Sequence, residues 1–156
     1  MTYSLALESF EQSYPELEPL YREHYAEMQA RLSSLGIEIS PFNPRKAQYC
    51  AAGNAGWLLT FVVRHEGHPV GYSNVYVTND MHNGDVIAQE DTVFVTKTHR
   101  NGIGRKLVKF VLSELASRKV KRLSVSAVTD TRAIPLWRRM GFKEAAVQMI
   151  YTFEGN

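Results

Sequence analysis

The stretch Val93-Phe94-Val95-Thr96-Lys97-Thr98-His99-Arg100-Asn101-Gly102-Ile103-Gly104 joins a strand pattern to a helix pattern through two closely spaced glycines. Residues 86–95 are rich in β-branched side chains, which is typical of a strand. After the glycines, apolar residues recur every three to four positions, which is typical of one helix face. These residues are Ile103, Leu107, Val108, Val111, Leu112 and Leu115. The sequence therefore predicts a strand, a glycine loop and a helix in succession.

A glycine loop in this position is typical of a phosphate-binding site. The N-terminus of a helix offers unpaired backbone N–H groups and the positive end of the helix dipole, and both attract phosphate. Two other kinds of phosphate loop are excluded. A dinucleotide-binding loop has a third glycine where Leu107 stands, and a nucleotide-triphosphate loop has Lys-Ser/Thr where Arg105-Lys106 stand.

The rest of the pattern predicts an α/β protein with a mixed sheet. Strands are predicted at 3–7, 57–65, 70–77, 86–95, 121–128 and 146–153, and helices at 13–35, 45–52, 103–115 and 133–140. The order is β-α-α-β-β-β-α-β-α-β, an antiparallel meander followed by a βαβ crossover. No linker or internal repeat divides the sequence, so we expect a single domain over residues 1–156.

The start of the first helix is predicted from a capping box. Ser13 stands three residues before Glu16, which is the spacing of an N-cap and its reciprocal partner. Pro19 lies inside the predicted helix, where proline removes a hydrogen bond and clashes with the preceding turn. We therefore expect the helix to begin near Pro19 or to be kinked there.

Composition narrows the class of protein. Hydrophobic residues make up 44% and charged residues 22%, which excludes a disordered or collagen-like chain. No apolar run approaches the roughly 20 residues of a membrane span, and residues 1–5 carry no signal-peptide pattern. A single cysteine, Cys50, excludes an internal disulfide and a multi-cysteine zinc site. We expect a cytoplasmic protein with no metal and no membrane contact.

Charge is distributed unevenly along the chain. Residues 1–42 contain seven Glu and two Arg, a net charge of −5, whereas residues 97–122 contain nine basic residues and one acid. The basic segment suggests a polyanionic partner, such as a nucleotide, or a solvated helix face. Nucleic acid is disfavoured because Phe110 is the one aromatic residue in that segment, whereas single-strand binding surfaces stack bases on several.

Three segments, taken together and in order, resemble the GNAT superfamily of acyl-CoA N-acyltransferases. They are Val93-Phe94-Val95, Arg100-Asn101-Gly102-Ile103-Gly104-Arg105-Lys106-Leu107 and Asp130-Thr131-Arg132-Ala133-Ile134-Pro135-Leu136-Trp137-Arg138-Arg139-Met140-Gly141-Phe142. The resemblance implies a GNAT-like fold and transfer of an acetyl group from acetyl-CoA to a primary amine. A looser similarity, at residues 24–28 and 90–95, points to a phage-associated branch.

The resemblance also implies which residues bind acetyl-CoA. They are Val93, Phe94, Val95, Arg100, Asn101, Gly102, Ile103, Gly104, Arg105, Lys106, Asp130 and Trp137. In the family, an amide of the strand, here that of Val95, helps to stabilise the developing oxyanion. Three positions depart from the family pattern: His99 replaces Gln or Arg, Asp130 replaces Asn, and Trp137 replaces the Tyr that often serves as general acid. The general acid is therefore unassigned.

Acetyl transfer to an amine needs a group that removes a proton. An amine with a pKa near 10.4 is roughly 0.04% neutral at pH 7, so a carboxylate base would help. Glu90 and Asp91 lie just before the strand segment that the family uses for the thioester. Neighbouring strand residues point to opposite faces, so we expect one of the two to reach the site. A structural ion pair or a capping role is the alternative.

The acceptor and the activity itself remain open at this stage. The acceptor amine could belong to a protein lysine, a protein N-terminus or a small molecule. The acidic residues Glu23, Glu27 and Glu38 could meet a cationic acceptor, or could solvate a helix face. His24 fits the polar edge of a core better than a pocket wall. The alternative function is a GNAT-like module that binds CoA without turnover, because Trp137 and Asp130 depart from the family pattern.

Overall fold

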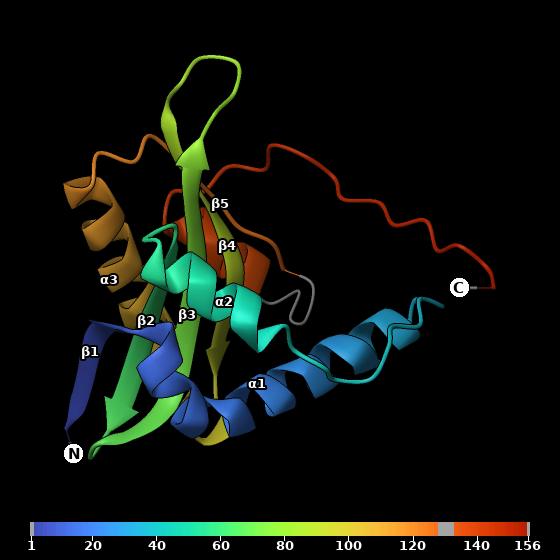
Figure 1. The fold of residues 1–156 in the computed structure, drawn as a ribbon, viewed down its shortest axis with the longest axis horizontal. Helices are drawn as coiled ribbons and strands as arrows, with labels where there is room; N and C mark the ends of the chain where they lie inside the picture. Colours follow the sequence, from blue (N-terminus) through green and yellow to red (C-terminus); the bar gives the residue numbers. More distant parts are fainter. Residues whose placement is uncertain (1, 128–132, 156) are drawn as a thin grey trace.

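The computed structural model describes residues 2–127 and 133–155, and within them it has the mixed α/β fold that the sequence predicts (Figure 1). The elements, in chain order, are β1 (Tyr3–Glu8), α1 (Phe10–Ser33), α2 (Lys46–Asn54), β2 (Leu58–His65), β3 (His68–Asn79), β4 (Val86–Val95), a 3₁₀ turn (Lys97–His99), α3 (Ile103–Ser117), β5 (Leu123–Ser124) and α4 (Ala133–Arg139). None of these helices combines the length and the apolar character that a membrane span requires.

The sheet confirms the predicted meander and crossover. Its strand order is β1-β2-β3-β4-β5. The first four strands pair antiparallel with their neighbours along the chain, and β5 pairs parallel with β4. Helix α3 makes the connection between these two parallel strands.

Helices cover both faces of the sheet, and β2 shows why the fold is stable. Leu59, Phe61 and Val63 pack in one core cluster with α3, whereas Leu58 and Val62 pack in a second cluster with α1 and α2. Because alternate side chains of a strand point to opposite faces, an apolar run such as β2 suits a strand buried on both sides. Figure 1 shows α1 and α2 on the near face and α3 behind the sheet.

Helix α1 begins four residues earlier than its predicted capping box. Ser9 is the N-cap, and its side chain accepts a hydrogen bond from the Gln12 N–H at 3.3 Å. Ser13 lies inside the helix and donates to Glu8 Oε2 at 2.6 Å. The helix also continues through Pro15 and Pro19. Burial of its apolar face against the sheet outweighs the backbone hydrogen bonds that the prolines remove.

The predicted strands after α3 are largely wrong. The strand expected at 121–128 is reduced to β5, and the strand expected at 146–153 is not formed. A strand exists through its partners, and neither segment has a neighbour along its whole length. Figure 1 shows the C-terminal segment running away from the sheet as an extended chain.

A buried polar network ties β2, β3 and α1 together. Asn74 is 0% exposed; its side chain accepts a hydrogen bond from Thr60 Oγ1 at 2.8 Å and donates one to the Tyr21 hydroxyl at 2.7 Å. The ladder between β3 and β4 changes register immediately after Asn74. The network therefore fixes the position on β3 opposite which β4 becomes irregular.

We expect Tyr21→Phe to destabilise the protein by about 1–3 kcal/mol, because it leaves the buried Asn74 amide without an acceptor. Thermal or urea unfolding measures the loss. Tyr25→Phe is the matched control, since Tyr25 lies on the same helix and donates to the Ser40 carbonyl at an exposed position. Equal stability changes in the two variants would contradict the structural role of the network.

Candidate functional site

A cavity of about 420 Å³ opens where β4 and β5 separate. The two strands share two residue pairs, Ala88 with Leu123 and Gln89 with Ser124. Beyond these pairs, β4 continues to Val95 with no β5 residue beside it. The cavity walls come from α1, β4, the glycine loop, α3, the chain after β5, and α4. The cavity therefore lies in a gap in the sheet and is reached from both faces.

The glycine loop forms one end of this cavity. Gly102 is the N-cap of α3 and has a φ of 99°, a left-handed conformation that favours glycine. The backbone N–H groups of Ile103, Gly104 and Arg105 have no hydrogen-bond acceptor within the described parts of the chain. A Cβ added to Gly104 would meet nothing closer than the Val95 side chain at 3.9 Å. The loop thus presents free donors and open space.

Glu90 lies on the cavity wall formed by β4. It pairs in register with Val75, and its Oε2 accepts a hydrogen bond from the Ser126 N–H at 3.1 Å. Burial raises the pKa of Glu90 to about 7, and the nearby negative charge of Asp91 raises it further, while the Ser126 N–H opposes the shift. Glu90 is therefore a carboxylate that changes its charge near neutral pH.

Asp91 is the extra residue of a β-bulge. On β3, Asn74 pairs with Thr92 and Val75 pairs with Glu90, so Asp91 has no opposite residue. Its Oδ2 accepts a hydrogen bond from the Tyr49 hydroxyl of α2 at 3.1 Å. Burial raises the pKa of Asp91, and the hydrogen bond from Tyr49 opposes the increase.

Both carboxylates line the cavity, whereas alternation along a strand predicted one. Glu90 is on the α3 side of the sheet with Val75, and Asp91 turns toward Tyr49 on the α2 side. The sequence expectation about opposite faces is therefore right. The conclusion drawn from it is wrong because the cavity passes through the sheet and is open to both faces.

Arg100 is the clearest departure from the predicted division of roles. Its guanidinium donates to both carboxylate oxygens of Glu27 on α1, at 2.9 and 3.0 Å, and its Nε donates to the Val95 carbonyl at 2.7 Å. It also lies over the ring of Phe94, 5.4 Å from the centroid. The sequence assigned Arg100 to the cofactor and Glu27 to the acceptor, but the structure joins them in one ion pair at the cavity wall.

The other acidic residues considered for the acceptor do not reach the cavity. Glu38 accepts a hydrogen bond from Ser33 at 2.7 Å, and Glu23 is not among the lining residues. His24, in contrast, does line the cavity, so its preferred assignment to the core edge is incomplete. Its ring packs edge-on against Phe94, with centroids 5.5 Å apart. Burial lowers the pKa of His24 to about 4, so the imidazole is neutral at pH 7.

The predicted cofactor residues divide into three groups. Those that line the cavity are Val93, Phe94, Val95, Arg100, Gly102, Gly104, Arg105 and Trp137. Ile103 is 4% exposed and packs in the core, while Asn101 and Lys106 are exposed at the surface away from the cavity lining. Asp130 lies outside the described residues.

Trp137 of α4 closes the cavity opposite the glycine loop. Its side chain is 8% exposed, and its indole Nε1 has no hydrogen-bond partner within residues 2–127 and 133–155. A buried N–H without an acceptor costs free energy, so it favours a ligand that supplies one.

Several lining residues were missed by sequence reasoning. They are Met28, Val108, Ser126, Ala127, Ala133 and Leu136. Met28 and Val108 carried a signal, since each stands on the apolar stripe of a predicted helix. Ser126 carried none, because its contribution is a backbone N–H that any residue could supply. Among the described residues, no three His, Cys, Asp or Glu side chains gather as a metal-ligand set.

Comparison with known families finds one match. The model of the acetyltransferase (GNAT) family matches residues 2–142, which include α1, the glycine loop and α4. No curated protein matches the sequence.

Solved structures match over nearly the whole chain. Ribosomal-protein-alanine N-acetyltransferase from Brucella melitensis is 16% identical with a TM-score of 0.72, covering 98% of this chain and 100% of that one. An aminoglycoside acetyltransferase from an uncultured soil metagenomic sample, in complex with sisomicin, is 20% identical with a TM-score of 0.70, covering 97% of each chain. Glucosamine-6-phosphate N-acetyltransferase from Arabidopsis thaliana is 13% identical with a TM-score of 0.69, covering 99% and 100%. These similarities show a shared fold.

Proposed function

Because this chain belongs to the GNAT family of acetyltransferases, we propose that it transfers the acetyl group of acetyl-CoA to a primary amine. Residues 1–156 would form one catalytic domain. The structural neighbours act, by name, on a ribosomal-protein alanine, an aminoglycoside and glucosamine 6-phosphate. These acceptors differ in size and share an amino group, so the proposal extends to the amine and no further.

One observation carries this proposal. A single cavity joins the free N–H groups at the start of α3 to a carboxylate, Glu90, whose pKa is about 7. The first end suits the phosphates of an acyl-CoA. The second end suits removal of a proton from an amine at neutral pH. An acyl donor and an amine can therefore meet between the two ends.

The glycine loop fits the phosphate-bearing part of acetyl-CoA. The N–H groups of residues 103–105 are unpaired within the described chain and the space over Gly104 is open, so phosphate oxygens could approach the backbone. Arg105 stands at the same end of the cavity and adds positive charge. Arg100 is held by Glu27, so we assign it to positioning the loop against α1. Bound there, acetyl-CoA would supply the thioester carbonyl that the amine attacks.

Glu90 is the proposed general base. It takes the proton from the acceptor ammonium, the neutral nitrogen forms a bond to the acetyl carbon, and the C–S bond breaks to leave the CoA thiolate. The N–H of Val95, on the β4 segment that lines the cavity, is the proposed donor to the carbonyl oxygen as its charge develops. The indole N–H of Trp137 cannot act as an acid, but it can donate a hydrogen bond to the leaving sulfur.

Asp91 is proposed to bind the acceptor. It lines the cavity, and the hydrogen bond from Tyr49 occupies one of its oxygens, so the other can face a cation. His24 is neutral and adds no repulsion to a positively charged acceptor. We also propose a cytoplasmic location, since Cys50 is a free thiol and forms no disulfide within the chain.

Acetyl-CoA should raise the melting temperature of the protein, because a ligand that binds the folded state stabilises it. Gly104→Asp should abolish this shift by placing a carboxylate where phosphate oxygens approach. Ser113→Asp adds the same charge at an exposed position of α3 and is the matched control. If acetyl-CoA shifts the Gly104→Asp variant as much as the parent, the loop assignment is wrong.

Glu90→Gln should lower kcat/KM by about 10²–10⁴ at pH 7. Because the base acts when ionised and its pKa is about 7, activity of the parent should rise as the pH increases through 7. The variant should lose this step and keep the slope that comes from the amine alone. Initial rates from pH 5.5 to 9, with Asp91→Asn and Glu23→Gln in parallel, make the measurement.

The three variants should differ in kind. Asp91→Asn should raise KM for the amine more than it lowers kcat, and Glu23→Gln should match the parent because Glu23 is outside the cavity. Full activity in Glu90→Gln would exclude Glu90 as the base. A parent that binds acetyl-CoA but acetylates no amine would favour the alternative of a non-catalytic CoA-binding module.

A further inference from the structure

The C-terminal segment 146–153 exposes an unusual amount of apolar surface. Five of its side chains are between 48% and 89% exposed: Val147, Met149, Ile150, Tyr151 and Phe153. Four of them stand at alternate positions, which in an extended chain places them on one face. The fifth, Ile150, is on the other face and is the least exposed. The segment has the pattern of a half-buried strand but has no strand partner in the described chain.

The outer edge of β5 has the complementary deficiency. The hydrogen bonds printed for residues 121–126 run toward β4: the Lys121 N–H to Val86, the Arg122 carbonyl from Ala88, and the Ser126 N–H to Glu90. On the other side, no strand of residues 2–127 and 133–155 pairs with β5. An uncovered sheet edge presents unpaired N–H and C=O groups, which makes it a template for a further strand.

We propose that segment 146–153 of one copy pairs with the outer edge of β5 in a second copy, and that the exchange is reciprocal. Figure 1 shows the segment directed away from its own sheet, where another molecule could receive it. Residues 146–153 contain no charged side chain, so nothing in them repels a second copy. Reciprocal exchange is also a closed two-fold arrangement, in which each copy satisfies the other and no further edge is left.

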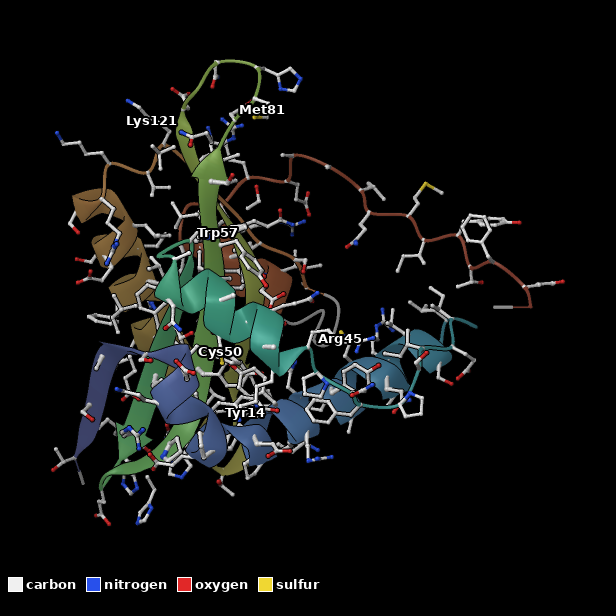
Figure 2. All side chains as sticks on the ribbon, in the orientation of Figure 1. Tyr14, Arg45, Cys50, Trp57, Met81 and Lys121 are labelled. Atoms are coloured by element: carbon white, nitrogen blue, oxygen red, sulfur yellow. The ribbon has the colours of Figure 1, made fainter. Side chains whose placement is uncertain are left out.

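The area involved is sufficient for a stable dimer. Large apolar side chains have about 150–250 Å² of surface each, so the five exposed ones present about 700 Å² per chain. Two segments present about 1,400 Å², which is within the range of about 1,200–2,000 Å² for specific interfaces. Figure 2 shows side chains projecting from this segment with no element of the chain packed beside them.

The exchanged segment would also border the functional cavity. Ser126 and Ala127, which follow β5, line that cavity. A strand added to the outer edge of β5 would therefore support this wall from outside. The inference rests on the fold and on the exposed segment, so it does not depend on the proposed activity.

Sedimentation equilibrium of the full chain tests the dimer. We expect a mass twice the 17.7 kDa of one chain at micromolar concentration. Met149→Glu with Tyr151→Glu, on the apolar face, should weaken the dimer at least 100-fold. Gln148→Glu with Thr152→Glu adds the same charge to the opposite face of the same segment and should weaken it less. Because the segment lies outside the core, all variants should keep the parent's circular dichroism spectrum.

Cross-linking identifies where the segment binds. In a Cys50→Ser background, one tagged chain carries Ser124→Cys on β5, and a co-expressed chain with a different tag carries Gln148→Cys. A short bismaleimide should yield a covalent dimer with both tags. A monomeric parent, a dimer unaffected by charges on the apolar face, or an intramolecular cross-link in a chain that carries both cysteines would each overturn the proposal.

Discussion

The separation of β4 from β5 after two residue pairs is the constraint on which the rest of the structure depends. A parallel pair that continued together would fill the sheet and leave no room between the two helix layers. Because β4 runs on alone to Val95, its last residues line a gap of about 420 Å³. The glycine loop and α3 follow β4 directly, so the free N–H groups at the start of α3 open into the same gap. One topological event thus places a phosphate-binding helix end beside an incomplete strand edge.

The bulge at Asp91 adds a second carboxylate to that gap. Its position is fixed from the other side of the sheet, where the hydrogen bonds of Asn74 to Thr60 and Tyr21 hold β3 just before the register changes. Burying two acids side by side is unfavourable unless one is protonated, and this explains the raised pKa of Glu90. The cost in hydration that makes Glu90 unfavourable for stability is what suits it to accept a proton at neutral pH.

Sequence patterns predicted the features that depend on neighbours along the chain. Strands β2 to β4, the glycine loop and the apolar face of α3 follow from local periodicity, and the structure agrees. The errors arose where a distant partner decides. Ser9 rather than Ser13 caps α1, since the helix must begin early enough to bury Phe10. The ion pair between Arg100 and Glu27 joins residues 73 positions apart, and no local pattern encodes it. The unformed strand at 146–153 has the right pattern and lacks a partner in its own chain.

The central claim is that the gap between β4 and β5 holds a carboxylate tuned to neutral pH. A ¹³C NMR titration of the side-chain carboxyl groups tests it most directly, with the Glu90 signal assigned by its absence from Glu90→Gln. The account predicts that this signal titrates with a pKa of about 7 in the free protein. A pKa near 4.3, the value of an unperturbed glutamate, would contradict it.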